Sequence, residues 1–136
     1  MGSHNAVVQL LLGKADVDPD HSDEFGQTPL WAAAFYGHRP VMELLLATNG
    51  VYINHKNAGG RMPLSSAAGT GHESVVKLLL AIDKIQPDSK DSRGQTPLSH
   101  VARMGHKAVA KLLLTNNGVD SNSKDDRGWA PLSSAA

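Results

Sequence analysis

Residues 26–46 read GQTPLWAAAFYGHRPVMELLL, and close variants of this stretch begin at residues 60 and 94. A further copy begins at residue 128 with GWAPLSSAA. The opening glycines lie 34 residues apart, and the Gly-His pairs and the triple leucines keep the same spacing. A repeat of this length is one supersecondary unit, which buries its apolar face only by stacking on its neighbours. The sequence therefore predicts an all-α solenoid of stacked helix-turn-helix units linked by β-turn loops.

Local chemistry within the first full copy marks a turn followed by a short helix. Asp23 and Gly26 suit the first and fourth positions of a type I turn. Thr28 suits the N-cap, and Pro29 suits the first helical position because it has no N–H group to leave unsatisfied. Gly37 is expected to end this helix.

A second, longer helix is predicted from residue 39 or 40 to about Ala47. Val41, Leu44 and Leu45 have the i, i+3, i+4 spacing of a buried stripe. In later copies Met62 and Ala130 replace the threonine cap. Because a missing N-cap costs about 1 kcal/mol, we expect those helix starts to be weaker and Met62→Thr to be stabilising by about that amount.

The pattern TPLxxAAxxGH followed by VxxLLL closely resembles the ankyrin repeat, and the resemblance covers nearly the whole chain in register. The 34-residue period and the serines at 65, 99 and 133 are similar to the variant found in long arrays of filamentous-fungal multidomain proteins, although Trp31 departs from it. The resemblance implies a non-enzymatic protein–protein interaction module. It also implies that the chain is a fragment of a larger sensor or scaffold protein.

One array is expected over residues 1–136, with a cut unit at each end. Residues 1–25 would hold a second helix only and residues 128–136 a first helix only, on either side of the full repeats 26–59, 60–93 and 94–127. Both ends keep apolar side chains, so one end could complete the other in a head-to-tail contact. A structural spacer that self-associates end to end is therefore the alternative function.

The resemblance implies a concave binding surface made by the turn tips and the first helices. The copies differ there at the two residues before the turn glycine, the residue after it and the two residues before Gly-His. The predicted partner-binding residues are Glu24, Phe25, Gln27, Phe35, Tyr36, Arg61, Thr70, Arg93, Gln95, Arg103, Met104, Arg127 and Trp129. Aromatic residues with arginine are typical of binding hot spots, so an acidic partner segment beside an apolar one would complement this surface. We expect Phe35 and Tyr36 to be surface residues whose loss leaves folding nearly unchanged.

Charge and motif content argue against other classes of function. The 13 Lys and Arg residues balance the 13 Asp and Glu residues, so the field that attracts nucleic acid is missing. No segment approaches the roughly 18 apolar residues of a membrane span, and the chain has no cysteine, so an intracellular, cytoplasmic location is expected. Neither GxxxxGKS/T nor GxGxxG is present, and no cofactor is expected.

The seven histidines are the remaining candidates for metal binding or catalysis. His38, His72 and His106 recur at the repeat period, so they should lie roughly 10 Å apart. That is too far to share a zinc ion, whose ligands bind at about 2.1 Å. We expect these three to bind backbone groups at the inter-helix turn. His100 has no repeat partner, and no carboxylate or hydroxyl stands at a spacing that would place it reliably beside His100, so neither a catalytic nor a metal site is predicted.

Overall fold

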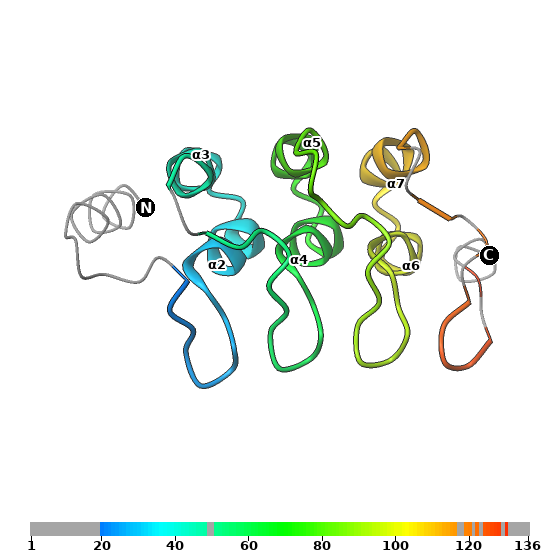
Figure 1. Cartoon of the computed structure of the whole chain (residues 1–136). Helices are drawn as coiled ribbons and strands as arrows, with labels where there is room; N and C mark the ends of the chain where they lie inside the picture. Colours follow the sequence, from blue (N-terminus) through cyan, green and yellow to red (C-terminus); the bar gives the residue numbers. More distant parts are fainter. Residues whose placement is uncertain are drawn as a thin grey trace.

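The computed structural model describes residues 20–48, 51–116, 119–120, 122, 124–128 and 130. Its helices form consecutive pairs: α2 (Pro29–Tyr36) with α3 (Arg39–Leu46), α4 (Pro63–Gly69) with α5 (Glu73–Leu80), and α6 (Pro97–Met104) with α7 (Lys107–Leu114). Figure 1 shows α2, α4 and α6 in one row, α3, α5 and α7 in a second row, and long turn loops extending beyond the first row. The predicted all-α solenoid is confirmed.

The two helices of a unit have nearly the same length, so the expectation of a short helix followed by a longer one is wrong. α2 and α3 each span eight residues, because α2 uses every residue from Pro29 to the one before Gly37. Gly37 has a φ of 71°, in the left-handed region that ends a helix. At the other end of the pair, Ala47 is the C-cap of α3 and not its last helical residue.

Threonine caps begin the first helices of two units as predicted. The Thr28 hydroxyl accepts a hydrogen bond from the backbone N–H of Trp31 at 3.2 Å. Thr96 and Ser99 form a reciprocal capping box, in which each side chain accepts from the other residue's backbone N–H. The starts of α2 and α6 are therefore fixed by local side-chain chemistry.

A continuous apolar core lies between the two rows of helices. Its repeating members are Leu30, Leu64 and Leu98 from the first helices, and Val41, Val75, Val109, Leu45, Leu79 and Leu113 from the second helices. Leu44, the third residue of the predicted stripe, is only partly buried. Because each unit shields the apolar face of the next, the core belongs to the stack and not to any single unit.

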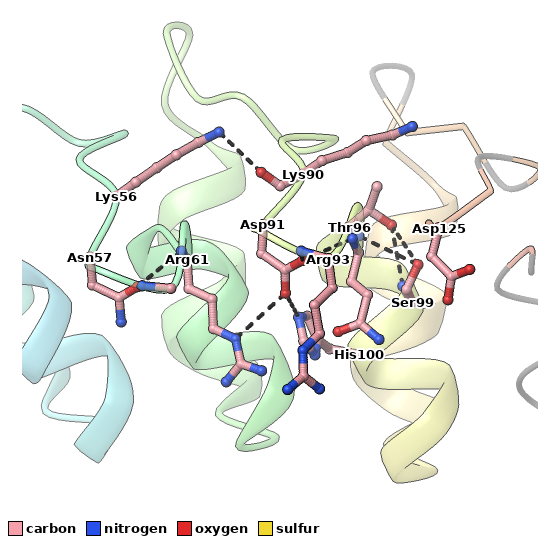
Figure 2. Close-up of polar contacts among 12 residues, drawn as sticks. Lys56, Asn57, Arg61, Lys90, Asp91, Arg93, Thr96, Ser99, His100 and Asp125 are labelled. Atoms are coloured by element: carbon pink, nitrogen blue, oxygen red, sulfur yellow. Dashed lines mark hydrogen bonds and ion pairs between the residues drawn. The ribbon is translucent and has the colours of Figure 1, made fainter. Parts of the chain in front are cut away.

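Hydrogen bonds also join each unit to the next along the turn tips. The backbone N–H of Ala58 donates to the carbonyl of Phe25 at 2.9 Å, and that of Ser92 donates to the carbonyl of Gly59 at 3.0 Å. Lys56 Nζ donates to the carbonyl of Lys90 at 3.0 Å, a contact that spans 34 residues (Figure 2). The sequence period thus corresponds to a repeated set of contacts between neighbouring units.

The Gly-His pairs connect units at the inter-helix turns. His72 Nε2 lies 3.0 Å from the carbonyl oxygen of Phe35, and His106 Nε2 lies 3.2 Å from that of Gly69. A carbonyl oxygen only accepts, so Nε2 carries the proton in both rings. The predicted structural role is confirmed for these two histidines. The expected partial units at 1–25 and 128–136 fall mostly outside the described residues, and the possible end-to-end contact falls there too.

Burial of Met62 reverses the expected effect of giving α4 a threonine cap. Met62 occupies the N-cap position without a side-chain hydrogen bond, and its side chain is fully buried in the core. Met62→Thr would gain a cap of about 1 kcal/mol but lose most of an apolar burial of about 2–3 kcal/mol. We expect a net loss of about 1 kcal/mol in the free energy of unfolding, measured in urea. Met62→Leu is the volume-conserving control, and a raised unfolding midpoint for Met62→Thr would contradict this balance.

Two glycines of equal backbone conformation separate the cost of strain from the cost of stacking. Gly71 and Gly105 have φ values of 79° and 77°, but their surroundings differ. A Cβ on Gly71 would lie 2.9 Å from the His106 ring, whereas no heavy atom of the described residues lies within 4 Å of a Cβ on Gly105. Gly105→Ala should therefore cost about 1–2 kcal/mol for its left-handed conformation. Gly71→Ala should cost about 1–3 kcal/mol more, because the neighbouring ring must move. Equal losses in thermal or urea unfolding would show that this ring contact does not matter.

Candidate functional site

A groove of about 430 Å³ crosses the inner faces of three successive first helices, α2, α4 and α6. Its lining residues are Gln27, Trp31, Phe35, Asn57, Arg61, Ser65, Ser66, Gly69, Thr70, His100, Arg103 and Met104. The helices that carry these side chains are held side by side by the core, so the shape of the groove follows from the stacking. No single unit could form it.

The structure places the predicted partner-binding residues at four kinds of position. Six of them line this groove: Gln27, Phe35, Arg61, Thr70, Arg103 and Met104. Five are exposed without lining this groove: Glu24, Phe25, Tyr36, Arg93 and Arg127. Gln95 has a side chain only 3% exposed, so the expectation of a surface residue is wrong there and we leave it out of the proposed surface. Trp129 lies outside the described residues.

Sequence reasoning missed several lining residues, namely Trp31, Asn57, Ser65, Ser66 and His100. Variation between the copies could have identified Ser66 and His100. Ala32, Ser66 and His100 occupy equivalent positions in the three copies and all differ, which is the same kind of variation that identified the predicted set. Trp31 was noticed only as a departure from the family pattern.

An aromatic cluster forms the α2 side of the groove. The rings of Trp31 and Phe35 are stacked with their centroids 5.3 Å apart and an interplanar angle of 11°. Phe35 meets Tyr36 edge to face, with centroids 5.1 Å apart. Trp31 is buried, whereas Phe35 and Tyr36 are exposed. The buried indole therefore supports the two rings that face solvent.

Asp91 organises the turn before α6. Its Oδ1 accepts hydrogen bonds from the backbone N–H groups of Arg93 at 2.8 Å and Gln95 at 2.9 Å. Asn57 makes the equivalent pair of bonds in the preceding unit, with Gly59 and Arg61. One side-chain oxygen therefore satisfies the turn, whether the residue is Asp or Asn.

The second oxygen of Asp91 contacts two further side chains (Figure 2). His100 Nε2 lies 3.0 Å from Asp91 Oδ2, and Arg61 Nε, from the preceding unit, lies 3.6 Å from the same oxygen. No carboxylate stands at a sequence spacing that places it reliably beside His100, yet the folded turn brings Asp91 there. Asp91 precedes His100 by nine residues, and the turn together with the start of α6 folds back to bring the two side chains into contact.

Electrostatics assign the charges in this cluster. Burial raises the pKa of Asp91, but hydrogen bonds from the backbone of Gln95 and Arg93 and from the side chain of His100 outweigh it and leave the pKa below its ordinary value. Burial and the Arg61 guanidinium lower the pKa of His100 more than Asp91 raises it. At neutral pH the imidazole is therefore neutral beside an ionised carboxylate. Because that carboxylate can only accept, His100 Nε2 carries the proton and donates to Asp91.

This arrangement is suited to binding more than to bond-breaking chemistry. An Asp–His pair becomes a nucleophile-activating system only when a hydroxyl or thiol lies against the imidazole. Among the described residues, no hydroxyl forms a hydrogen bond with His100. The described part of the chain also holds no group of three or more potential metal ligands.

Asp91→Asn tests the network without disturbing the turn. Asparagine already serves at the equivalent position 57, so the turn bonds should survive, whereas the charged acceptor for His100 and Arg61 is lost. We expect a loss of about 1–3 kcal/mol in the free energy of unfolding, measured in urea at neutral pH. The matched control is Asp23→Asn. Asp23 Oδ1 accepts from the backbone N–H groups two and four residues later, as Asp91 Oδ1 does. Its change should stay within about 0.5 kcal/mol, and equal losses for the two variants would argue against the network.

Comparison with known proteins identifies the repeat. A family model described as ankyrin repeats (three copies) matches residues 1–91 and 82–136, which together span the whole chain. A search of curated proteins finds no match. No helix among the described residues is long and apolar enough to cross a bilayer. Ankyrin repeats are in general protein–protein interaction modules and typically not enzymes. The chain belongs to the ankyrin-repeat family.

Proposed function

We propose that the chain binds a protein partner on its concave surface, defined here as the turn tips and the inner faces of α2, α4 and α6. The observation that carries this proposal is the groove of about 430 Å³ across three units, with an aromatic cluster on its α2 side. As part of the same proposal, the array is the recognition part of a larger sensor or scaffold protein, similar to the long fungal arrays. End-to-end self-association involves residues outside the described part, so the proposal rests on the concave surface alone.

Large apolar side chains supply the binding energy in this proposal. Phe25, Phe35, Tyr36 and Met104 are all exposed on this surface. Exposed apolar residues gathered on one face mark an interaction site more often than scattered ones do. Tyrosine and arginine are enriched at binding hot spots, and the surface offers both. A partner that covers these side chains would remove their apolar area from water.

A rigid platform favours this use of the surface. The first helices are held by the core, by caps at Thr28 and Thr96, and by the hydrogen bonds between turn tips. Only exposed side chains then need to be ordered when a partner binds. Each such side chain costs about 0.5–1.5 kcal/mol, far less than ordering a flexible segment.

Removing both exposed rings tests the proposal. We expect Phe35→Ala with Tyr36→Ala to abolish partner binding. The stacking of Phe35 on Trp31 changes the expectation that folding would be nearly unaffected, because an aromatic pair is worth about 0.5–1.5 kcal/mol and its loss adds to the usual small cost of a surface change. The double variant should therefore stay folded at 25 °C but lose about 1–2 kcal/mol of stability in urea unfolding.

The matched control is Tyr52→Ala. Tyr52 is as exposed as Tyr36, at 54% against 56%, but it lies in the loop after α3 and does not line the groove. Binding by the control variant should equal that of the wild type. If partner binding survives loss of Phe35 and Tyr36, or is lost equally with Tyr52, the concave surface is not the binding site.

A further inference from the structure

The groove carries more positive than negative charge, because Asp91 is the one described carboxylate that pairs with its arginines. Arg61 and Arg103 line it, and no Asp or Glu is among the lining residues. Both guanidinium groups lower the pKa of the same imidazole, that of His100, which lines the groove with them. Arg93, from the turn before α6, lines a second groove together with Arg103. The charge is therefore concentrated where the units of α4 and α6 meet.

Both carboxylate oxygens of Asp91, which pairs with Arg61, already have partners within the protein. Oδ1 accepts two backbone N–H groups, and Oδ2 accepts from His100 while contacting Arg61. Its side chain is only 2% exposed, so it cannot turn into the groove without losing these bonds. Asp91 therefore orients Arg61 through Nε, and about half of the arginine side chain stays exposed.

The two arginines keep their binding ends available. Arg61 Nε lies 3.6 Å from Asp91 Oδ2, and the Arg61 side chain is about half exposed. Arg103 forms no hydrogen bond or ion pair with any described residue. A guanidinium group binds a carboxylate through paired N–H donors, and such charge-assisted bonds are about twice as strong as neutral ones. The geometry thus offers two unfilled donors for one acceptor group.

We infer that the groove receives the carboxylate side chain of an Asp or Glu in the partner, held between Arg61 and Arg103, while a neighbouring apolar side chain of the partner packs on Phe35. The inference rests on the proposed function and specifies the class of its partner, an acidic segment that also carries an aromatic or aliphatic residue. Charge complementarity selects the carboxylate, and the stacked Trp31–Phe35 pair in the same groove selects the apolar neighbour.

A nucleic acid fits these observations less well. Polyanion binding requires a run of phosphate contacts, and affinity grows with the number of cations that meet the backbone. Here the chain has no net charge, and Arg127, the next arginine along the turn tips, is paired with Asp125 at 3.6 Å. The two arginines of the groove, Arg61 and Arg103, match a single carboxylate better than a run of phosphates.

The test is a selection from a random linear-peptide library against the full chain, followed by affinity measurements on the best peptide. We expect the selected peptides to share an Asp or Glu at a fixed spacing from an aromatic or aliphatic residue. Arg61→Gln with Arg103→Gln should weaken binding of the best peptide by at least about tenfold. Gln is the natural residue at positions 27 and 95, which are equivalent to 61, and Arg103 is exposed, so this variant should fold.

Controls separate local pairing from a general loss of charge. Lys107→Gln with Lys111→Gln removes two positive charges from α7, in the second row of helices, and should change the affinity by less than about twofold. Replacing the acidic residue of the peptide by its amide should weaken binding to the wild type as much as the double arginine change does. It should have no further effect on the arginine variant, which is the signature of direct coupling.

Several results would overturn the inference, and they differ in what they imply for the proposed function. Selected peptides without an acidic residue, or equal binding by the arginine variant, would reject the carboxylate site alone, provided that Phe35→Ala with Tyr36→Ala still abolishes binding. Binding of a single-stranded RNA probe that depends on Arg61 and Arg103 would replace the acidic peptide with nucleic acid. Failure to select any peptide, or peptides insensitive to loss of Phe35 and Tyr36, would reject the proposed function as well.

Discussion

Contact between successive units is the constraint on which the rest of this structure depends. Each unit is two helices of about eight residues, far below the length at which an isolated helix is stable in water. The stack supplies what the single unit lacks: a shared core, turn tips joined by backbone hydrogen bonds, and a histidine that reaches the carbonyl of the unit before it. Gly37 shows how tight this fit is, because a Cβ there would lie 2.5 Å from the His72 ring. The period is therefore enforced by packing.

The same constraint creates the candidate site. Arg61 belongs to one unit, and Asp91 and His100 to the next, so their meeting depends on how far the second unit is offset from the first. The groove likewise needs α2, α4 and α6 together. Side chains that maintain stacking, such as Leu64 and Val75, are fully buried and cannot contribute to recognition. In the proposed function, recognition is left to exposed positions such as Phe35 and Arg103, where the copies also differ.

This division explains what could be predicted from the sequence. Helix order, the threonine caps and the backbone contacts of His72 and His106 follow from local chemistry and the period, and the sequence was sufficient for them. Contacts between side chains were not predictable in the same way. Gln95 was expected on the surface by analogy with Arg61, yet it is buried between its neighbours, although it lines a second groove with Arg93 and Arg103. The Asp91–His100 pair was missed because its nine-residue separation has meaning only after the turn is folded.

The turn residue shows how the charge of the groove can change while the hydrogen bonds of the turn stay the same. Asp23, Asn57 and Asp91 each accept two backbone N–H groups through Oδ1, so the turn requires one oxygen and nothing more. The second polar atom is left free for other interactions. Where it is an amide, as at Asn57, it adds no charge, whereas at Asp91 it adds a carboxylate that keeps His100 in place and orients Arg61. One atom of difference between units therefore alters the electrostatics of the groove, while the hydrogen bonds that hold the turn remain the same.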